Sequence, residues 1–157
     1  EDRHFDPQQV SLMYIVAGAI AILGNTTAGR ISDYLGRRPT LVAMLVLHCV
    51  ATITFYNTGG WLLSVTWIAA LFGYFAVEVM VNAMSGELFP TACRSTASTL
   101  RSISAMFAAV AGLAVESILY SSLGSHSAAI SIISLSSLLA IPVVVLMLRE
   151  TSGTELS

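Results

Sequence analysis

Long apolar stretches separated by short polar segments form the main pattern of this chain. They run over residues 10–28, 40–56, 61–85, 98–120 and 128–148. A helix of about 17 to 25 mostly apolar residues crosses the hydrocarbon core of a bilayer, because each residue adds about 1.5 Å of rise. The pattern therefore predicts an all-α membrane protein, a bundle of five transmembrane helices without a second domain.

Composition supports this class of protein. Hydrophobic residues make up 55% of the chain and charged residues only 10%, which is far too apolar for an ordinary soluble domain. The seven basic residues form no basic patch of the kind that binds nucleic acid. We therefore expect a multi-pass protein of the cell membrane (plasma or inner), with the lipid bilayer as a partner and no nucleic acid.

The distribution of arginine predicts the orientation of the helices. Six of the seven arginines fall at the same ends of the predicted spans, and they are Arg30, Arg37, Arg38, Arg94, Arg101 and Arg149. Arginine is enriched in the cytoplasmic loops of membrane proteins. The pattern therefore predicts that residues 1–9 lie outside the cell and that the carboxyl terminus is cytoplasmic.

The segment 29–39 reads G-R-I-S-D-Y-L-G-R-R-P and is predicted to be a tight cytoplasmic loop. Gly29 and Gly36 would let the backbone turn, and Asp33 can accept hydrogen bonds. Arg37 and Arg38 can clamp a carboxylate or a phosphate headgroup. The simpler interpretation is that these arginines only mark the cytoplasmic side of the membrane.

Three motifs resemble those of one family. The spacing G-x-x-x-D-x-x-G-R-R resembles the cytoplasmic loop motif of the major facilitator superfamily, solute transporters of twelve helices. Residues 87–94, E-L-F-P-T-A-C-R, resemble the E-x-x-P-T-x-x-R element of sugar-porter-like and related members. Residues 149–156 resemble the P-E-T-x-G-x-x-L ending, with Arg149 in place of the proline. Their order implies that residues 1–157 are the carboxyl-terminal half, helices eight to twelve, with the amino-terminal half outside this sequence.

The resemblance implies transport of a small organic solute by alternating access. The solute would be a sugar, an organic ion or a carboxylate, a proton could be the coupling ion of a symporter, and neither a cofactor nor an enzymatic reaction is implied. The motif residues would form a network of ion pairs that holds the cytoplasmic gate, a latch made of Gly29, Asp33, Gly36, Arg37, Arg38, Glu87, Arg94 and Glu150. The alternative is a receptor or structural subunit that does not transport.

Polar residues within the spans are the candidates for binding a substrate or a proton. A carboxylate in the bilayer is costly unless it faces protein or water. Glu78 and Asn82 share one face of their span with Trp67 and Tyr74 at helical spacing, which predicts a cavity lining. The candidates are Tyr14, Asn25, Tyr74, Glu78, Asn82 and Glu116.

Glu78 supports two interpretations. It could carry a coupling proton, or Glu78 and Asn82 could form hydrogen bonds between helices with a structural role only. His48 is interpreted as a structural residue, and Cys49 and Cys93 as free thiols. No metal-binding motif is present, and Pro142 predicts a kink in the last span.

Overall fold

The computed structural model describes residues 7–148 of the chain, and in this part every regular element is an α-helix. The helices are α1 (Pro7–Leu35), α2 (Arg37–Asn57), α3 (Trp61–Leu88), α4 (Arg94–Leu123), α5 (His126–Ser137) and α6 (Ala140–Met147). Five helical segments are long and apolar enough to cross a membrane, with α5 and α6 together making the fifth. The predicted all-α bundle of five spans is thus confirmed.

The predicted spans are shorter than the helices of the structure. The difference is clearest at the segment 29–39, which was predicted to be a loop. This segment is helical apart from Gly36, since α1 continues to Leu35 and α2 begins at Arg37. A span drawn from hydropathy ends at the first charged residues. A helix continues past the bilayer because its own backbone hydrogen bonds remain satisfied there. The same effect lengthens α3 and α4, which leaves only residues 89–93 between them.

The last span is broken near Pro142, as the sequence predicted. Helix α5 ends at Ser137, and α6 begins at Ala140 after a turn whose backbone hydrogen bonds join residues three apart, such as Ile141 N to Leu138 O at 3.0 Å. Proline has no N–H to donate to the carbonyl four residues earlier, and its ring collides with that carbonyl. Here that carbonyl belongs to Leu138, which lies in the turn.

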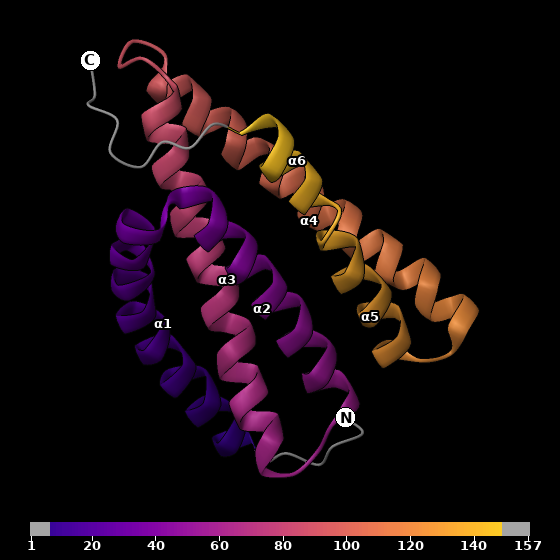
Figure 1. Ribbon diagram of the computed structural model, residues 1–157. Helices are drawn as coiled ribbons and strands as arrows, with labels where there is room; N and C mark the ends of the chain where they lie inside the picture. The colour runs from indigo at the N-terminus through magenta and orange to yellow at the C-terminus, as the bar shows by residue number, and fades with distance from the viewer. Residues whose placement is uncertain (1–6, 149–157) are drawn as a thin grey trace.

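Helices α1, α2 and α3 lie side by side, whereas α4, α5 and α6 run obliquely across them (Figure 1). The buried core joins α1, α2, α3 and α6, and its members are Ala28, Leu41, Leu45, Ala76, Met80, Met84 and Val144. Small residues permit the closest contacts. The ring of Phe72 lies directly over Gly24, and Gly73 approaches the backbone of α2 at His48.

Helix α4 packs differently from the others. It contacts α5 more extensively than α3, and it has no buried residue. Large apolar side chains such as Phe107, Val110 and Leu113 are exposed along it. Such exposure is expected for a helix in lipid, where apolar side chains need no protein partner.

Candidate functional site

Arg37 lies at the centre of the ion pairs at one end of the bundle. Its Nη2 and Nε donate to the two carboxylate oxygens of Glu87 at 2.7 and 3.4 Å, so that α2 is joined to the end of α3. Its Nη1 lies 3.0 Å from Asp33 Oδ1 and donates to Ser32 Oγ at 2.6 Å. The side chains of Arg37 and Glu87 are only 14% and 18% exposed. A guanidinium group has several N–H donors in one plane, so two of them can donate to the two oxygens of one carboxylate.

The turn at Gly36 positions Arg37 beside Glu87. Gly36 has φ 99°, a conformation that side chains with a Cβ rarely adopt. Its N–H donates to Ser32 O at 3.1 Å, and its carbonyl accepts from Thr40 Oγ1 at 2.8 Å. The predicted turn at Gly36 is therefore confirmed. The predicted turn at Gly29 is wrong, because Gly29 lies within α1 and its carbonyl accepts a hydrogen bond from Ser32 Oγ.

Two other charged members of the expected network are Arg38 and Arg94. Arg38 donates through Nη2 to the backbone carbonyl of Val145 and so joins α2 to α6. Arg94 begins α4, and its buried Nε has no hydrogen-bond partner among the described residues. Glu150 lies outside the described residues. Of the expected latch, the structure thus brings together Asp33, Arg37 and Glu87.

Glu78 forms an ion pair that the sequence analysis missed. Its Oε2 lies 3.1 Å from Arg101 Nη1, and this hydrogen bond joins α3 to α4. The sequence analysis treated Arg101 only as a marker of the cytoplasmic side. Both residues lie within long helices on either side of the turn 89–93, Glu78 about three turns before it and Arg101 about two turns after it. Because two helices joined by a short turn run side by side, opposite charges at these comparable distances from the turn were the signal that could have identified the pair.

The expected polar stripe of α3 is divided in the structure. Trp67 and Tyr74 line a cavity of about 600 Å³ between α2, α3, α4 and α5. Glu78 and Asn82 do not line this cavity. Asn82 is exposed. Glu116 of α4 lines the same cavity together with Ala109 and Gly112. Of the candidates, Tyr74 and Glu116 therefore line this cavity, whereas Glu78 and Asn82 do not.

One histidine lines this cavity, and a second contacts Glu116. His48 Nδ1 lies 2.9 Å from Ala70 O, a contact between helices that agrees with its predicted structural role, and His48 also contributes to the lining. His126 Nδ1 lies 3.5 Å from Glu116 Oε1, and the His126 ring stacks on Tyr120 with centroids 3.9 Å apart. The sequence alone does not predict this contact, because it depends on the turn between α4 and α5 that brings His126 back to Glu116.

The candidates on α1 do not line this cavity. The Tyr14 ring meets the Trp67 ring edge-on with centroids 5.4 Å apart, and both residues line a pocket of about 130 Å³ between α1, α2 and α3. Asn25 Oδ1 is buried without a hydrogen-bond partner among the described residues. Tyr14 and Asn25 thus lie apart from the cavity that holds Tyr74 and Glu116.

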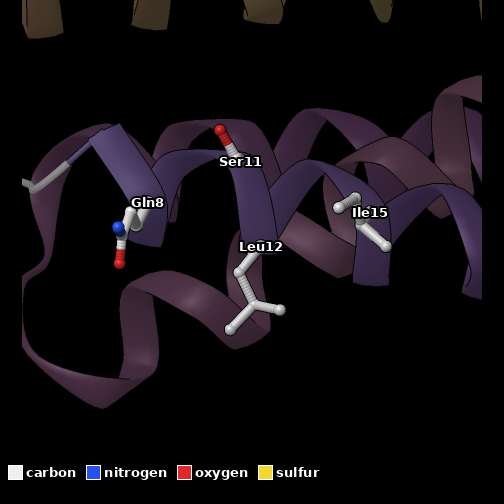
Figure 2. A pocket seen from close by; sticks show the side chains of 4 residues that line it. All are labelled: Gln8, Ser11, Leu12 and Ile15. Carbon is white, nitrogen blue, oxygen red and sulfur yellow. The ribbon is translucent and has the colours of Figure 1, made fainter.

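Figure 2 shows a further hollow at the start of α1, lined by Gln8, Ser11, Leu12 and Ile15. All four residues belong to a single helix and none is charged. Ser11 Oγ and the Leu12 side chain point in different directions in this view. We interpret this hollow as an exposed helix surface and do not include it in the candidate site.

Possible metal ligands and free thiols are the remaining chemical groups of the described residues. Within residues 7–148, no group of three or more His, Cys, Asp or Glu side chains could hold a metal ion. Cys49 is buried, Cys93 is exposed, and both are free. The two cysteines therefore match the free thiols expected from the sequence.

Comparison with models of protein families gives a match. A family model described as Major Facilitator Superfamily matches residues 1–156, which is nearly the whole chain. A search of curated proteins found no match. The helical architecture, the glycine turn at Gly36 and the arginine cluster beside it agree with the family match. The chain therefore belongs to the Major Facilitator Superfamily, a family of membrane proteins that transport small solutes.

Proposed function

We propose that this chain takes part in secondary active transport of a small organic solute by alternating access, with a proton as the coupling ion. The family transports small solutes, and a secondary transporter alternates between outward-open and inward-open states by rocking its halves. The E-x-x-P-T-x-x-R element at residues 87–94 favours a sugar, an organic ion or a carboxylate as the solute. Residues 1–157 would form the carboxyl-terminal half of such a transporter.

The observation that carries the proposal is the position of Arg37. It joins the turn between α1 and α2 to the end of α3 through Glu87, on the side where the arginine distribution predicts the cytoplasm. An exposed ion pair contributes only up to about 1 kcal/mol. Removing one partner of a buried pair costs about 3 to 5 kcal/mol, because the other charge is left unpaired. Arg37 also contacts Asp33 and Ser32, so we expect the contacts of this guanidinium group together to bias one conformational state over another.

Transport itself is tested by flux. The purified protein in liposomes should accumulate a sugar, an organic ion or a carboxylate when a pH gradient is imposed, and accumulation should stop when the gradient is collapsed. A receptor or structural subunit would bind a solute without net movement. Binding without flux across this panel of solutes would therefore contradict the proposal.

The role of the Arg37–Glu87 pair is tested by charge reversal. Glu87→Arg places two like charges together, so we expect uptake to fall at least about tenfold, the effect of about 1.4 kcal/mol. The matched control swaps both charges and neutralises Asp33, which lies 3.0 Å from Arg37 and would repel a carboxylate there. This triple variant, Arg37→Glu with Glu87→Arg and Asp33→Asn, should recover a substantial part of the uptake. The latch is wrong if Glu87→Arg leaves both uptake and the ratio of inward-open to outward-open protein unchanged.

A further inference from the structure

Ser32 is a buried polar side chain in contact with Arg37. It lies in the last turn of α1 and is 0% exposed. Its hydroxyl donates to the carbonyl of Gly29 at 2.7 Å and accepts from Arg37 Nη1 at 2.6 Å. A serine hydroxyl has one proton and two lone pairs. Because the proton is used in the bond to Gly29, a lone pair is left for Arg37, whose side chain has donors only.

The contact with Ser32 helps to fix the orientation of the guanidinium group of Arg37. This group is planar, and its N–H donors point outward in fixed directions. While Nη1 donates to Ser32, Nη2 and Nε donate to Glu87 at 2.7 and 3.4 Å. One part of the guanidinium group is thus held by α1 and the other part by α3.

Asp33 contacts the same nitrogen of Arg37 from a more exposed position. Its carboxylate oxygen lies 3.0 Å from Nη1, and its side chain is 62% exposed. Exposed ion pairs gain little, because water and salt screen them. Water does not reach the fully buried hydroxyl of Ser32. Loss of this hydroxyl would therefore remove a contact that solvent cannot easily replace.

We propose that Ser32 is a positioning residue for the latch, and that its hydroxyl holds Arg37 in the orientation that pairs with Glu87. This inference rests on the proposed function of the Arg37–Glu87 pair. Without the hydroxyl, the arginine side chain gains rotamer freedom, and the loss of that freedom opposes formation of the pair. The conformational state that contains the pair then becomes less populated.

The first experiment asks whether Ser32 acts through Glu87. Ser32→Ala is introduced into the full-length protein, both with Glu87 present and together with Glu87→Leu, which is similar in size and has no acceptor. The readouts are uptake driven by a pH gradient and the ratio of inward-open to outward-open protein, measured from distances between spin labels on the cytoplasmic side.

The effect of Ser32→Ala should depend on Glu87. With Glu87 present, we expect uptake to fall about fivefold and the ratio of the two states to shift by a similar factor, the usual effect of one hydrogen bond. In the Glu87→Leu protein the pair is already lost, so Ser32→Ala should change the ratio less than about twofold. A serine with a structural role only would have the same effect in both proteins.

Thr27 provides a matched control on the same helix. Its hydroxyl donates to the carbonyl of Gly24 at 2.9 Å, three residues earlier, as the hydroxyl of Ser32 does to Gly29. Thr27 is exposed, however, and this hydrogen bond is local to α1. Thr27→Val removes the hydroxyl and keeps the shape of the side chain, so it should change uptake and the ratio less than about twofold.

A second variant replaces Ser32→Ala if that protein does not fold. Ser32→Cys keeps a side chain of similar length, but sulfur is a weak acceptor. We expect a shift in the same direction, at least about twofold with Glu87 present and absent in the Glu87→Leu protein.

Three results would overturn the proposal. They are an unchanged ratio of states in a folded Ser32→Ala or Ser32→Cys protein, an equal shift with and without Glu87, and an equal shift in Thr27→Val. The ratio of states is measured without a solute. A parent protein that shows both states but moves no solute would contradict the proposed transport and leave the role of Ser32 testable, whereas a transporting protein without the shift would contradict only the role of Ser32.

Discussion

At the scale of single residues, Glu78 and Glu116 each lie near a basic side chain. Glu78 lies 3.1 Å from Arg101, and Glu116 lies 3.5 Å from His126. A charged residue within a membrane span is stabilised by a partner of opposite charge, and such residues commonly mark proton or substrate pathways. If Glu78 carries the coupling proton, Arg101 must take part as well. Protonation of Glu78 would leave the charge of Arg101 without its anionic partner.

Glu78→Gln tests this coupling role. The amide keeps the size of the side chain and can still accept a hydrogen bond from Arg101, but it cannot take up a proton. We expect uptake driven by a pH gradient to fall to background, while exchange of substrate across the membrane without a gradient stays within about threefold of the parent protein. Both rates can be measured with labelled substrate in proteoliposomes.

Replacing both members of the pair provides the control. Glu78→Gln with Arg101→Gln leaves no unpaired charge, so a defect caused only by a buried charge should disappear in this double variant. A defect in proton coupling should remain. Gradient-driven uptake that survives in Glu78→Gln would dismiss the coupling role and favour the structural one.

At the scale of elements, Gly73 sets how closely α2 and α3 approach, and Gly18 provides a comparison. A Cβ at Gly73 would lie 2.9 Å from the backbone nitrogen of His48, and neither backbone can move without shifting its helix. A Cβ at Gly18 of α1 would meet no atom within 4 Å. The two positions therefore form a matched pair, one in a close crossing and one in open space.

Gly73→Ala should destabilise the protein by about 1 to 3 kcal/mol, the usual cost of extra volume in a packed contact. Gly18→Ala should leave stability unchanged or raise it by up to about 1 kcal/mol, because alanine favours the helix over glycine. Thermal unfolding of both variants in the same detergent measures the difference. Equal stability of the two variants would contradict the close crossing of α2 and α3.

At the scale of the whole molecule, the two free cysteines report on the orientation of the bundle. Cys93 is exposed in the connection between α3 and α4, on the side predicted to be cytoplasmic, whereas Cys49 is buried in α2. Thiol reagents that cannot cross a membrane distinguish the two faces, and a buried thiol reacts slowly with either.

A charged maleimide should label Cys93 in inside-out vesicles and leave it unlabelled in intact cells. Cys93→Ser should remove this labelling, because Cys49 is inaccessible inside the helix bundle. Labelling of Cys93 in intact cells would reverse the orientation predicted from arginine. The measurement thus decides which face carries the Arg37–Glu87 pair.

The elements that depend on local pattern were predicted well. The five apolar stretches, the turn at Gly36 and the break near Pro142 follow from hydropathy and from the backbone preferences of glycine and proline. The boundaries were less accurate, because a charged residue ends a hydropathy window without ending a helix. The family was also identified from its motifs, and these agree with the family match over residues 1–156.

The sequence by itself determined the class of protein, the number of spans and the residues that carry charge, because each depends on neighbours close along the chain. Only the tertiary structure decided which charges meet. Arg37 and Glu87 are 50 positions apart, and Glu78 and Arg101 are 23 apart. It also placed Tyr74 with Glu116 around one cavity and left Glu78 outside it. Such contacts depend on how the helices cross, and this is set by side-chain packing that helical periodicity does not specify.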